Sequence, residues 1–176
     1  MAGAKAAPKA VKPLYTPEQK KIRDESRWTL VQGLLAPFQF LVFLISLGLV
    51  IRYLMTGEGY ESATISVIVK TLTLYTIMVT GAIWEKVVFG KYLFAEAFFW
   101  EDVFSMLVIA LHTAYLVMVL GGYGTPVEQM FVALAAYATY VVNAIQFILK
   151  LRAARLQAER EARALGPMVS SAEAAR

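Results

Sequence analysis

Four long apolar runs, separated by short polar segments, constrain the fold of this 176-residue chain more than any other feature. They cover residues 30–54, 64–84, 103–120 and 130–149. Each is close to the roughly 20 apolar residues that cross a bilayer as a helix. Only 17% of the residues are charged, whereas a soluble domain usually carries about 25%. The sequence therefore predicts an all-α integral membrane protein, a four-transmembrane-helix bundle whose membrane domain covers residues 28–150.

The two tails are polar and basic. Residues 1–27 are predicted to form a partly disordered N-terminal tail that contains one short surface helix. Thr16 suits the N-cap of that helix, with Pro17 in its first turn and Gln19 completing a capping box. We expect no cleavable signal peptide, because the first thirty residues lack an apolar core. Residues 151–176 form a basic C-terminal tail, expected to stay helical to about residue 165.

Lysine and arginine are distributed unevenly between the segments outside the apolar runs. Seven lie in the N-terminal tail, two in the central loop and six in the C-terminal segment, whereas the other two loops have none. By the positive-inside rule, both termini and the central loop are predicted to be cytoplasmic.

Polar residues inside the apolar runs recur at helical spacing. Such stripes usually face neighbouring helices and hold a bundle together. We expect that role for these residues: Gln32, Gln39, Ser46, Thr139, Asn143 and Gln146, with Lys150 continuing the last stripe. Lys70 lies about two turns inside its run, and we expect it to extend toward the membrane surface rather than remain a buried charge.

The residue inventory excludes several kinds of site. The chain has no cysteine, which excludes disulfides, thiolate metal sites and a cysteine nucleophile. A single histidine, His112, excludes a site built from several histidines.

The stretch from Trp84 to His112 concentrates the ionisable residues near and inside the apolar runs, where such groups tend to be functional. Glu85 ends the second run, and Glu101 and Asp102 begin the third, so all three carboxyl groups should lie at similar depth. They could divide the roles of proton donor and water-positioning base. Glu101, Ser105, His112 and Tyr115 share one helical face, which places His112 about 14–16 Å deeper.

Structural alternatives remain open for each of these residues. Glu85 could form a surface pair with Lys86, and Glu101 and Asp102 could complement a helix start. The loop aromatics could form an interfacial belt or the walls of a pocket for a planar ring. His112 could bond a partner helix, ligate a metal carried by a substrate, or move a proton.

Long segments of the chain match a known pattern. They are YTPEQ (15–19), SRWTLVQGLLAPFQFLVFLISLGLVIRYL (26–54), VIVKTLTLYTIMVTGAIWEKVVFGKYLFAEAFFWEDVFSMLVIALHTAYL (67–116) and NAIQFILKLRAARLQ (143–157). In these segments the chain resembles the 2-vinyl (also numbered 3-vinyl) bacteriochlorophyllide hydratases of photosynthetic bacteria, over about residues 15–156.

The resemblance implies addition of water to the 3-vinyl group of a chlorophyllide, giving a 3-(1-hydroxyethyl) product in bacteriochlorophyll a biosynthesis. It implies a tetrapyrrole substrate, a bacterial inner or photosynthetic membrane, neighbouring pigment enzymes as partners and no nucleic acid. No cofactor is expected beyond the magnesium that the substrate carries. On this basis the acid and base would come from Glu85, Glu101 and Asp102, with His112 as a magnesium ligand or second proton carrier.

The remaining candidate residues would bind the substrate. Lys86 or Lys91 would meet its carboxylate, and the walls and interior contacts would come from Trp84, Phe99, Trp100, Ser105 and Tyr115. Two other functions remain alternatives: a non-enzymatic pigment carrier or assembly subunit, and a small transporter or scaffolding bundle.

Overall fold

The computed structural model describes residues 13–174, with side chains described for residues 13–156, 158 and 159. Five α-helices and no strands form this part of the chain: α1 (Pro17–Glu25), α2 (Arg27–Thr56), α3 (Tyr60–Phe89), α4 (Phe99–Gly121) and α5 (Pro126–Ala174). The expectation of an all-helical chain with four apolar spans is confirmed, since α2, α3, α4 and residues 126–156 of α5 are each long and apolar enough to cross a membrane.

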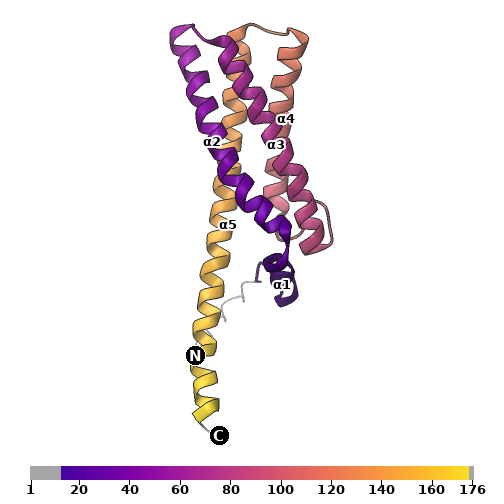
Figure 1. Ribbon diagram of the computed structural model, residues 1–176, viewed down its shortest axis with the longest axis vertical. Helices are drawn as coiled ribbons and strands as arrows, with labels where there is room; N and C mark the ends of the chain where they lie inside the picture. The colour runs from indigo at the N-terminus through magenta and orange to yellow at the C-terminus, as the bar shows by residue number, and fades with distance from the viewer. Residues whose placement is uncertain (1–12, 175–176) are drawn as a thin grey trace, which may run out of the picture.

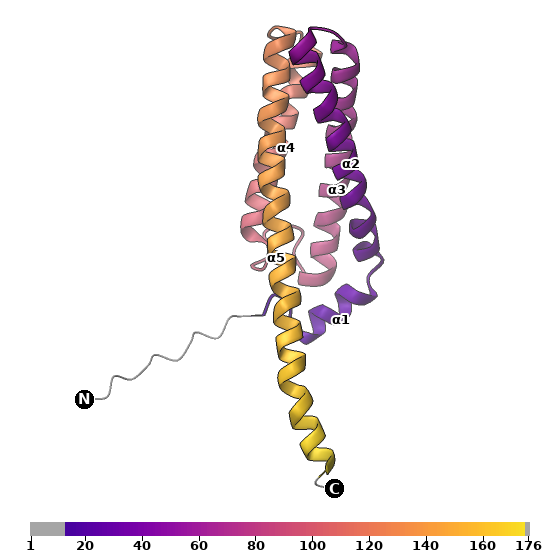
Figure 2. The same ribbon diagram turned by 90° about the vertical axis from the view of Figure 1, so that its left-hand side faces the viewer.

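The four long helices run side by side, and α5 continues well beyond the bundle (Figures 1 and 2). Within the bundle, α2 packs mainly on α3 and α4 mainly on α5. At one end of the bundle, one short turn joins α2 to α3 and another joins α4 to α5. Gly57 ends α2 and Gly122 ends α4, both in the left-handed conformation. The longer connection between the pairs, residues 90–98, lies at the opposite end, near α1 (Figure 1).

The short helix α1 begins as the sequence predicted. The Thr16 hydroxyl accepts a hydrogen bond from the Gln19 backbone N–H at 3.2 Å, and the Gln19 side chain accepts one from the Thr16 backbone N–H at 2.9 Å. These two bonds form the predicted capping box, and Pro17 occupies the first turn as predicted. The predicted disorder of the N-terminal tail falls mostly on residues 1–12, outside the described part of the chain. At the other end α5 continues to Ala174, past the end expected near residue 165.

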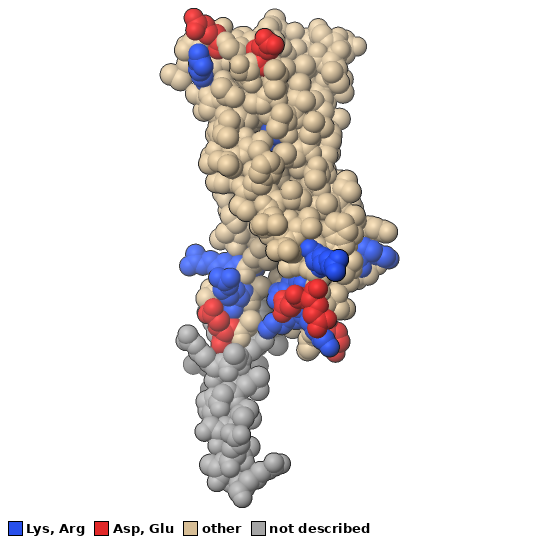
Figure 3. All heavy atoms as spheres, in the orientation of Figure 1, with Lys and Arg blue, Asp and Glu red and all other residues tan. Residues whose placement is uncertain are grey.

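The bundle buries β-branched side chains and several aromatic rings inside, and many large apolar side chains lie exposed on its outer surface. Val50, Val67 and Val108 are fully buried, whereas Leu34, Leu72 and Leu120 are more than half exposed. Figure 3 shows the consequence on one face: a band that is tan apart from one small blue area covers the bundle, and most charged side chains gather at its two ends. This arrangement is typical of a bundle whose outer surface meets lipid.

Candidate active site

Three carboxyl groups lie buried where α3 ends and α4 begins. Glu85 comes from the last turns of α3, and Glu101 and Asp102 come from the first turn of α4. Their exposed fractions are only 5%, 8% and 3%. The connection 90–98 joins these two helix ends and brings the carboxyl groups to the same end of the bundle, as the sequence predicted.

The backbone of the connection holds two of these carboxyl groups directly. The Phe94 N–H donates to Asp102 Oδ2 at 2.7 Å, and the Ala95 N–H donates to Glu85 Oε2 at 3.3 Å. Phe94 has a φ of 59°, and it is the only described residue other than glycine with a positive φ. Backbone strain of this kind costs about 1–3 kcal/mol and is typical of functional sites. The N–H groups of Phe94 and its neighbour Ala95 together hold the two carboxyl groups at this position.

Glu85 and Asp102 also interact with each other, although they come from different helices. Each carboxyl group is near enough to the other to act on it electrostatically. Glu101 lies beside them and forms an ion pair with Lys150, whose Nζ is 2.6 Å from Glu101 Oε2. The result is a cluster of three carboxyl groups and one ammonium group, built from α3, α4 and α5.

Lys150 is the member of this cluster that the sequence pattern does not predict. Helical spacing indicates only that it continues the polar stripe of the last span. The stripe does face inward, and Asn143 on the same face donates to Ser105 Oγ of α4 at 2.8 Å. Lys150 follows this stripe by one more helical turn. That spacing was the signal that could have predicted an ion pair between Lys150 and the acidic residues at the start of α4.

One structural alternative for the carboxyl groups is wrong, and the other is confirmed in part. Glu85 does not form a surface pair with Lys86, because the exposed Lys86 ammonium donates instead to the Gly90 carbonyl at 2.8 Å. Glu101 and Asp102 do lie in the first turn of α4, where acidic residues complement the helix dipole, but neither caps the helix, whose N-cap is Phe98 without a side-chain cap bond. Both are buried, and Asp102 accepts the bond from the Phe94 N–H.

The aromatic residues near the cluster divide into two groups. Phe98 is 2% exposed, and its ring packs against Trp84, Phe89 and Phe147 at centroid distances of 5.7, 5.8 and 5.9 Å. Phe99 and Trp100 are instead 44% and 68% exposed. The buried group forms an apolar wall next to the carboxyl groups, whereas the exposed group has the position of an interfacial belt.

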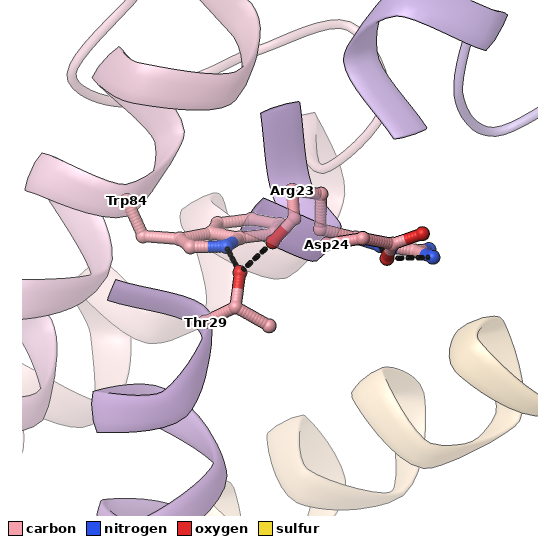
Figure 4. Close-up of polar contacts among 4 residues, drawn as sticks. All are labelled: Arg23, Asp24, Thr29 and Trp84. Atoms are coloured by element: carbon pink, nitrogen blue, oxygen red, sulfur yellow. Dashed lines mark hydrogen bonds and ion pairs between the residues drawn. The ribbon is translucent and has the colours of Figure 1, made fainter. Parts of the chain in front are cut away.

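Trp84 also connects the site to the N-terminal helices. Its Nε1 donates to the Thr29 hydroxyl at 2.9 Å, and that hydroxyl donates to the Arg23 carbonyl at 2.6 Å (Figure 4). The Arg23 side chain forms an ion pair with Asp24 at 2.6 Å (Figure 4). The indole is thus held between α3, α2 and the end of α1.

A cavity of about 460 Å³ opens beside the connection 90–98. Its lining includes Gln19 of α1, Phe89 at the end of α3, and Lys91 and Ala95 of the connection. Ala95 is the residue whose N–H binds Glu85, so the cavity adjoins the backbone that covers the carboxyl cluster. Lys91 and Lys86 are both exposed at this end of the bundle.

The rest of the predicted face of α4 extends away from the cluster into the bundle. Ser105, His112 and Tyr115 are all buried, on the same face as Glu101. His112 lies ten residues beyond Asp102, or about 15 Å along the helix, and Tyr115 about 20 Å. The structure therefore brings Ser105 near the cluster and places His112 and Tyr115 deeper.

His112 has one occupied and one free ring nitrogen. Nδ1 lies 2.8 Å from the Val108 carbonyl, which can only accept, so Nδ1 carries the proton of that bond. Nε2 is buried and has no hydrogen-bond partner among the described residues. Within the same residues, no group of three or more histidine or acidic side chains could hold a metal ion.

Comparison with known proteins gives consistent results. A family model for 2-vinyl bacteriochlorophyllide hydratase matches residues 15–153. A protein of that name from Rhodobacter capsulatus is 69% identical over 150 residues, which cover 85% of this chain and 87% of the relative. Another from Cereibacter sphaeroides is 70% identical over 146 residues, covering 83% and 91%. No solved structure matches this chain significantly.

Proposed function

Since this chain belongs to the 2-vinyl bacteriochlorophyllide hydratase family and is a hydratase of bacteriochlorophyll biosynthesis, we propose that Glu85 and Asp102 are its acid–base pair. They would add water to the vinyl group of a chlorophyllide and give the 3-(1-hydroxyethyl) product. The observation that carries this proposal is that two buried carboxyl groups from different helices are bound by consecutive backbone N–H groups, those of Phe94 and Ala95.

The pair suits the two proton transfers that hydration of an alkene requires. A carboxylic acid donates a proton to the terminal vinyl carbon. The electron pair of the double bond forms the new C–H bond, and the carbon attached to the ring becomes a cation. Water attacks that carbon, and a carboxylate takes the proton that the water loses. Transfer of this proton to the first carboxylate restores the starting state, so that no redox cofactor is consumed.

The two hydrogen bonds to the backbone suggest which carboxyl group has which role. Asp102 accepts the shorter bond, at 2.7 Å from the Phe94 nitrogen, and Glu85 the longer one, at 3.3 Å from the Ala95 nitrogen. A short N–H bond suits a carboxylate that acts as the base and holds the water. We therefore assign the acid to Glu85 and the base to Asp102.

Glu101 and Lys150 would support the reaction electrostatically. Glu101 is fixed by its 2.6 Å ion pair and lies next to Asp102. A fixed negative charge at this position favours a cation that develops on the substrate, because it needs no reorientation during the reaction. Lys150 limits the net charge of the cluster, which makes three buried carboxyl groups tolerable.

The other candidate residues fit parts of a magnesium chlorin. The free Nε2 of His112 has the lone pair that an axial magnesium ligand needs, and the substrate would bring the metal. Trp84 and the buried aromatic rings would contact the macrocycle, with Ser105 and Tyr115 further inside. The exposed Lys86 and Lys91 would meet a carboxylate at the membrane surface, where Phe99 and Trp100 suit anchoring to the interface.

We also propose that this end of the bundle faces the cytoplasm across the bacterial inner or photosynthetic membrane. The basic residues Lys20, Arg23, Lys86, Lys91 and Lys150 belong to α1, the connection 90–98, or the adjoining parts of α3 and α5. The opposite end carries Arg52 with three glutamates, so the positive-inside rule supports this orientation. Other pigment enzymes would then be able to exchange substrate from the same side.

The acid–base pair is tested with the variants Glu85→Gln and Asp102→Asn, which keep side-chain size and remove the transferable proton. Each should lower the rate of hydroxyethyl product formation by roughly 10²–10⁴-fold, the usual contribution of a general acid or base. Glu61→Gln, at the far end of α3, is the matched control and should keep the wild-type rate. If Glu85→Gln and Asp102→Asn both retain full activity on purified pigment, the assignment is wrong.

A further inference from the structure

Side chains from all four long helices meet in the bundle interior, at about the depth of His112. Lys70 of α3 lies with its Nζ 3.7 Å from the ring centroid of Tyr140 of α5, and it is close enough to His112 of α4 to act on it electrostatically. Phe43 of α2 packs its ring against Tyr140 at 5.0 Å. This set of residues, with Tyr137, is called the interior junction below.

Lys70 does not extend to the membrane surface, contrary to the sequence-based expectation. Its side chain is 0% exposed. It is ten residues from the start of α3, or about 15 Å along the helix, and its ammonium group turns inward onto an aromatic face. The attraction between that cation and the Tyr140 ring is the contact that holds it there.

The junction leaves two buried polar atoms without a hydrogen-bond partner in the described part of the chain. They are Nζ of Lys70, which can only donate, and Nε2 of His112, which has a free lone pair in the neutral ring. Five other buried side-chain atoms of the described residues also lack a partner, but this pair combines a donor with a free lone pair at one level of the bundle, which suits a group that binds there.

The charge of Lys70 indicates what kind of group this is. The described acidic side chains nearest Lys70 along the bundle lie toward its two ends: Glu58, Glu61 and Glu128 at one end and Glu85, Glu101 and Asp102 at the other. No described carboxyl group forms an ion pair with Lys70. A cation inside a membrane span normally pairs with a carboxylate or a carbonyl oxygen, so the missing partner should supply an acceptor oxygen.

The position of the junction indicates where that oxygen would come from. Lys70 belongs to the α2–α3 pair, whereas His112 and Tyr140 belong to the α4–α5 pair, so the junction lies between the two pairs. Glu85 and Asp102 lie between the same two pairs, nearer the end of the bundle: Asp102 is about 15 Å from His112 along α4, and Glu85 is about 22 Å from Lys70 along α3. A flat macrocycle inserted between the pairs with its vinyl group at these carboxyl groups would extend toward the junction.

We propose that the interior junction binds an acceptor oxygen of the pigment substrate, with Lys70 as the hydrogen-bond donor. This inference rests on the proposed function, because it requires a pigment whose vinyl group is at Glu85 and Asp102. The oxygen belongs to a carbonyl group on the ring system if the carboxylate tail lies at Lys86 or Lys91, and to the carboxylate tail itself if the tail enters the bundle instead of meeting those two lysines. In both cases Lys70 is a binding residue that sets how deeply the macrocycle enters the bundle.

The test is pigment binding to the purified protein in detergent, with chlorophyllide titrated and its visible absorbance recorded. Lys70→Met keeps the length of the side chain and removes the donor. It should raise the Kd by about 10- to 100-fold, the factor expected for loss of a hydrogen bond to a charged group. Lys70→Arg, which keeps a donor, should bind more tightly than Lys70→Met. Arg52→Met, which removes an exposed cation near the far end of α2, is the matched control and should leave the Kd unchanged.

A second pigment distinguishes the two sources of the oxygen. If the methyl ester of chlorophyllide loses affinity on Lys70→Met as the free acid does, a ring carbonyl is the partner. If only the free acid loses affinity, the carboxylate is the partner. An equal Kd and an unchanged absorbance spectrum for wild type and Lys70→Met would overturn the proposal.

Two further measurements keep the test independent of folding and of the proposed function. The infrared carbonyl and carboxylate bands of pigment bound to the wild-type protein should show one hydrogen-bonded oxygen, and free bands for both groups would overturn the proposal without any variant. Product formation by the wild type is recorded in parallel. If the wild type forms product but the oxygen bands of its bound pigment are unperturbed, the Lys70 site is refuted and the proposed function stands. If the protein binds pigment through Lys70 but forms no product, the proposed function is refuted.

Discussion

Replacing Lys150 with methionine tests how the carboxyl cluster tolerates its own charge. The substitution keeps most of the side-chain stem, which lies over the Phe98 ring with Nζ 4.9 Å from the centroid, and removes the cation of the 2.6 Å ion pair with Glu101. The side chain of Glu101 is 10% exposed and that of Lys150 is 25% exposed. The variant therefore leaves a buried carboxylate next to two other carboxyl groups.

The magnitude follows from these exposures. Removing one partner of a fully buried pair costs about 3–5 kcal/mol, and a hydrogen bond to a charged group contributes about 1.5–3 kcal/mol. Because water reaches part of Lys150, we expect Lys150→Met to lower the free energy of unfolding by about 2–3 kcal/mol. Glu101→Gln should cost less, about 1 kcal/mol, because the lysine left behind is the better solvated partner.

The assay is denaturant unfolding in mild detergent, followed by tryptophan fluorescence, for both single variants and the double variant. The double variant should be more stable than the sum of the single effects predicts, because removal of Glu101 relieves the carboxylate that Lys150→Met leaves unpaired. Arg52→Met serves as the control for loss of one exposed cation and should change stability by less than about 0.5 kcal/mol. Strictly additive effects, or a larger loss for Glu101→Gln than for Lys150→Met, would refute this account of the cluster.

Two further predictions concern the connection 90–98 and α1. Phe94→Pro removes the N–H that binds Asp102 and forces a negative φ, so it should lower the free energy of unfolding by about 3 kcal/mol and remove most of the hydratase activity. Phe94→Gly accepts the φ of 59° and should keep activity. Equal losses of activity in both variants would contradict this prediction. Burial raises the pKa of Tyr15, so its stacking on Phe89 should stabilise the fold fully below about pH 10, and this stabilisation should be lost as the pH rises through the raised pKa. The measurement is a pH titration followed by fluorescence, with Tyr15→Phe as the comparison. If Tyr15→Phe keeps the same alkaline transition as the wild type, the prediction is wrong.

The aromatic residues of the central stretch show that residue type alone does not predict which side chains are buried. Phe98 and Phe99 are neighbours in the sequence, yet one is buried against Trp84 and the other is 44% exposed. The connection 90–98 is irregular, so no helical periodicity determines which of its rings turns inward. Only its fold over the helix ends makes Phe98 a wall of the site.

The sequence by itself determined the helices, the buried face of α4 and the family. Apolar runs long enough to cross a bilayer leave helices as the available structure, and the spacing of Glu101, Ser105, His112 and Tyr115 is a property of one helix, so both could be predicted locally. The tertiary structure decided which groups from different helices meet. The pairing of Lys150 with Glu101, the contact of Glu85 with Asp102 and the inward turn of Lys70 onto Tyr140 depend on how helices rotate against each other. That rotation is set by the packing of whole helix faces, which no single stretch of sequence encodes.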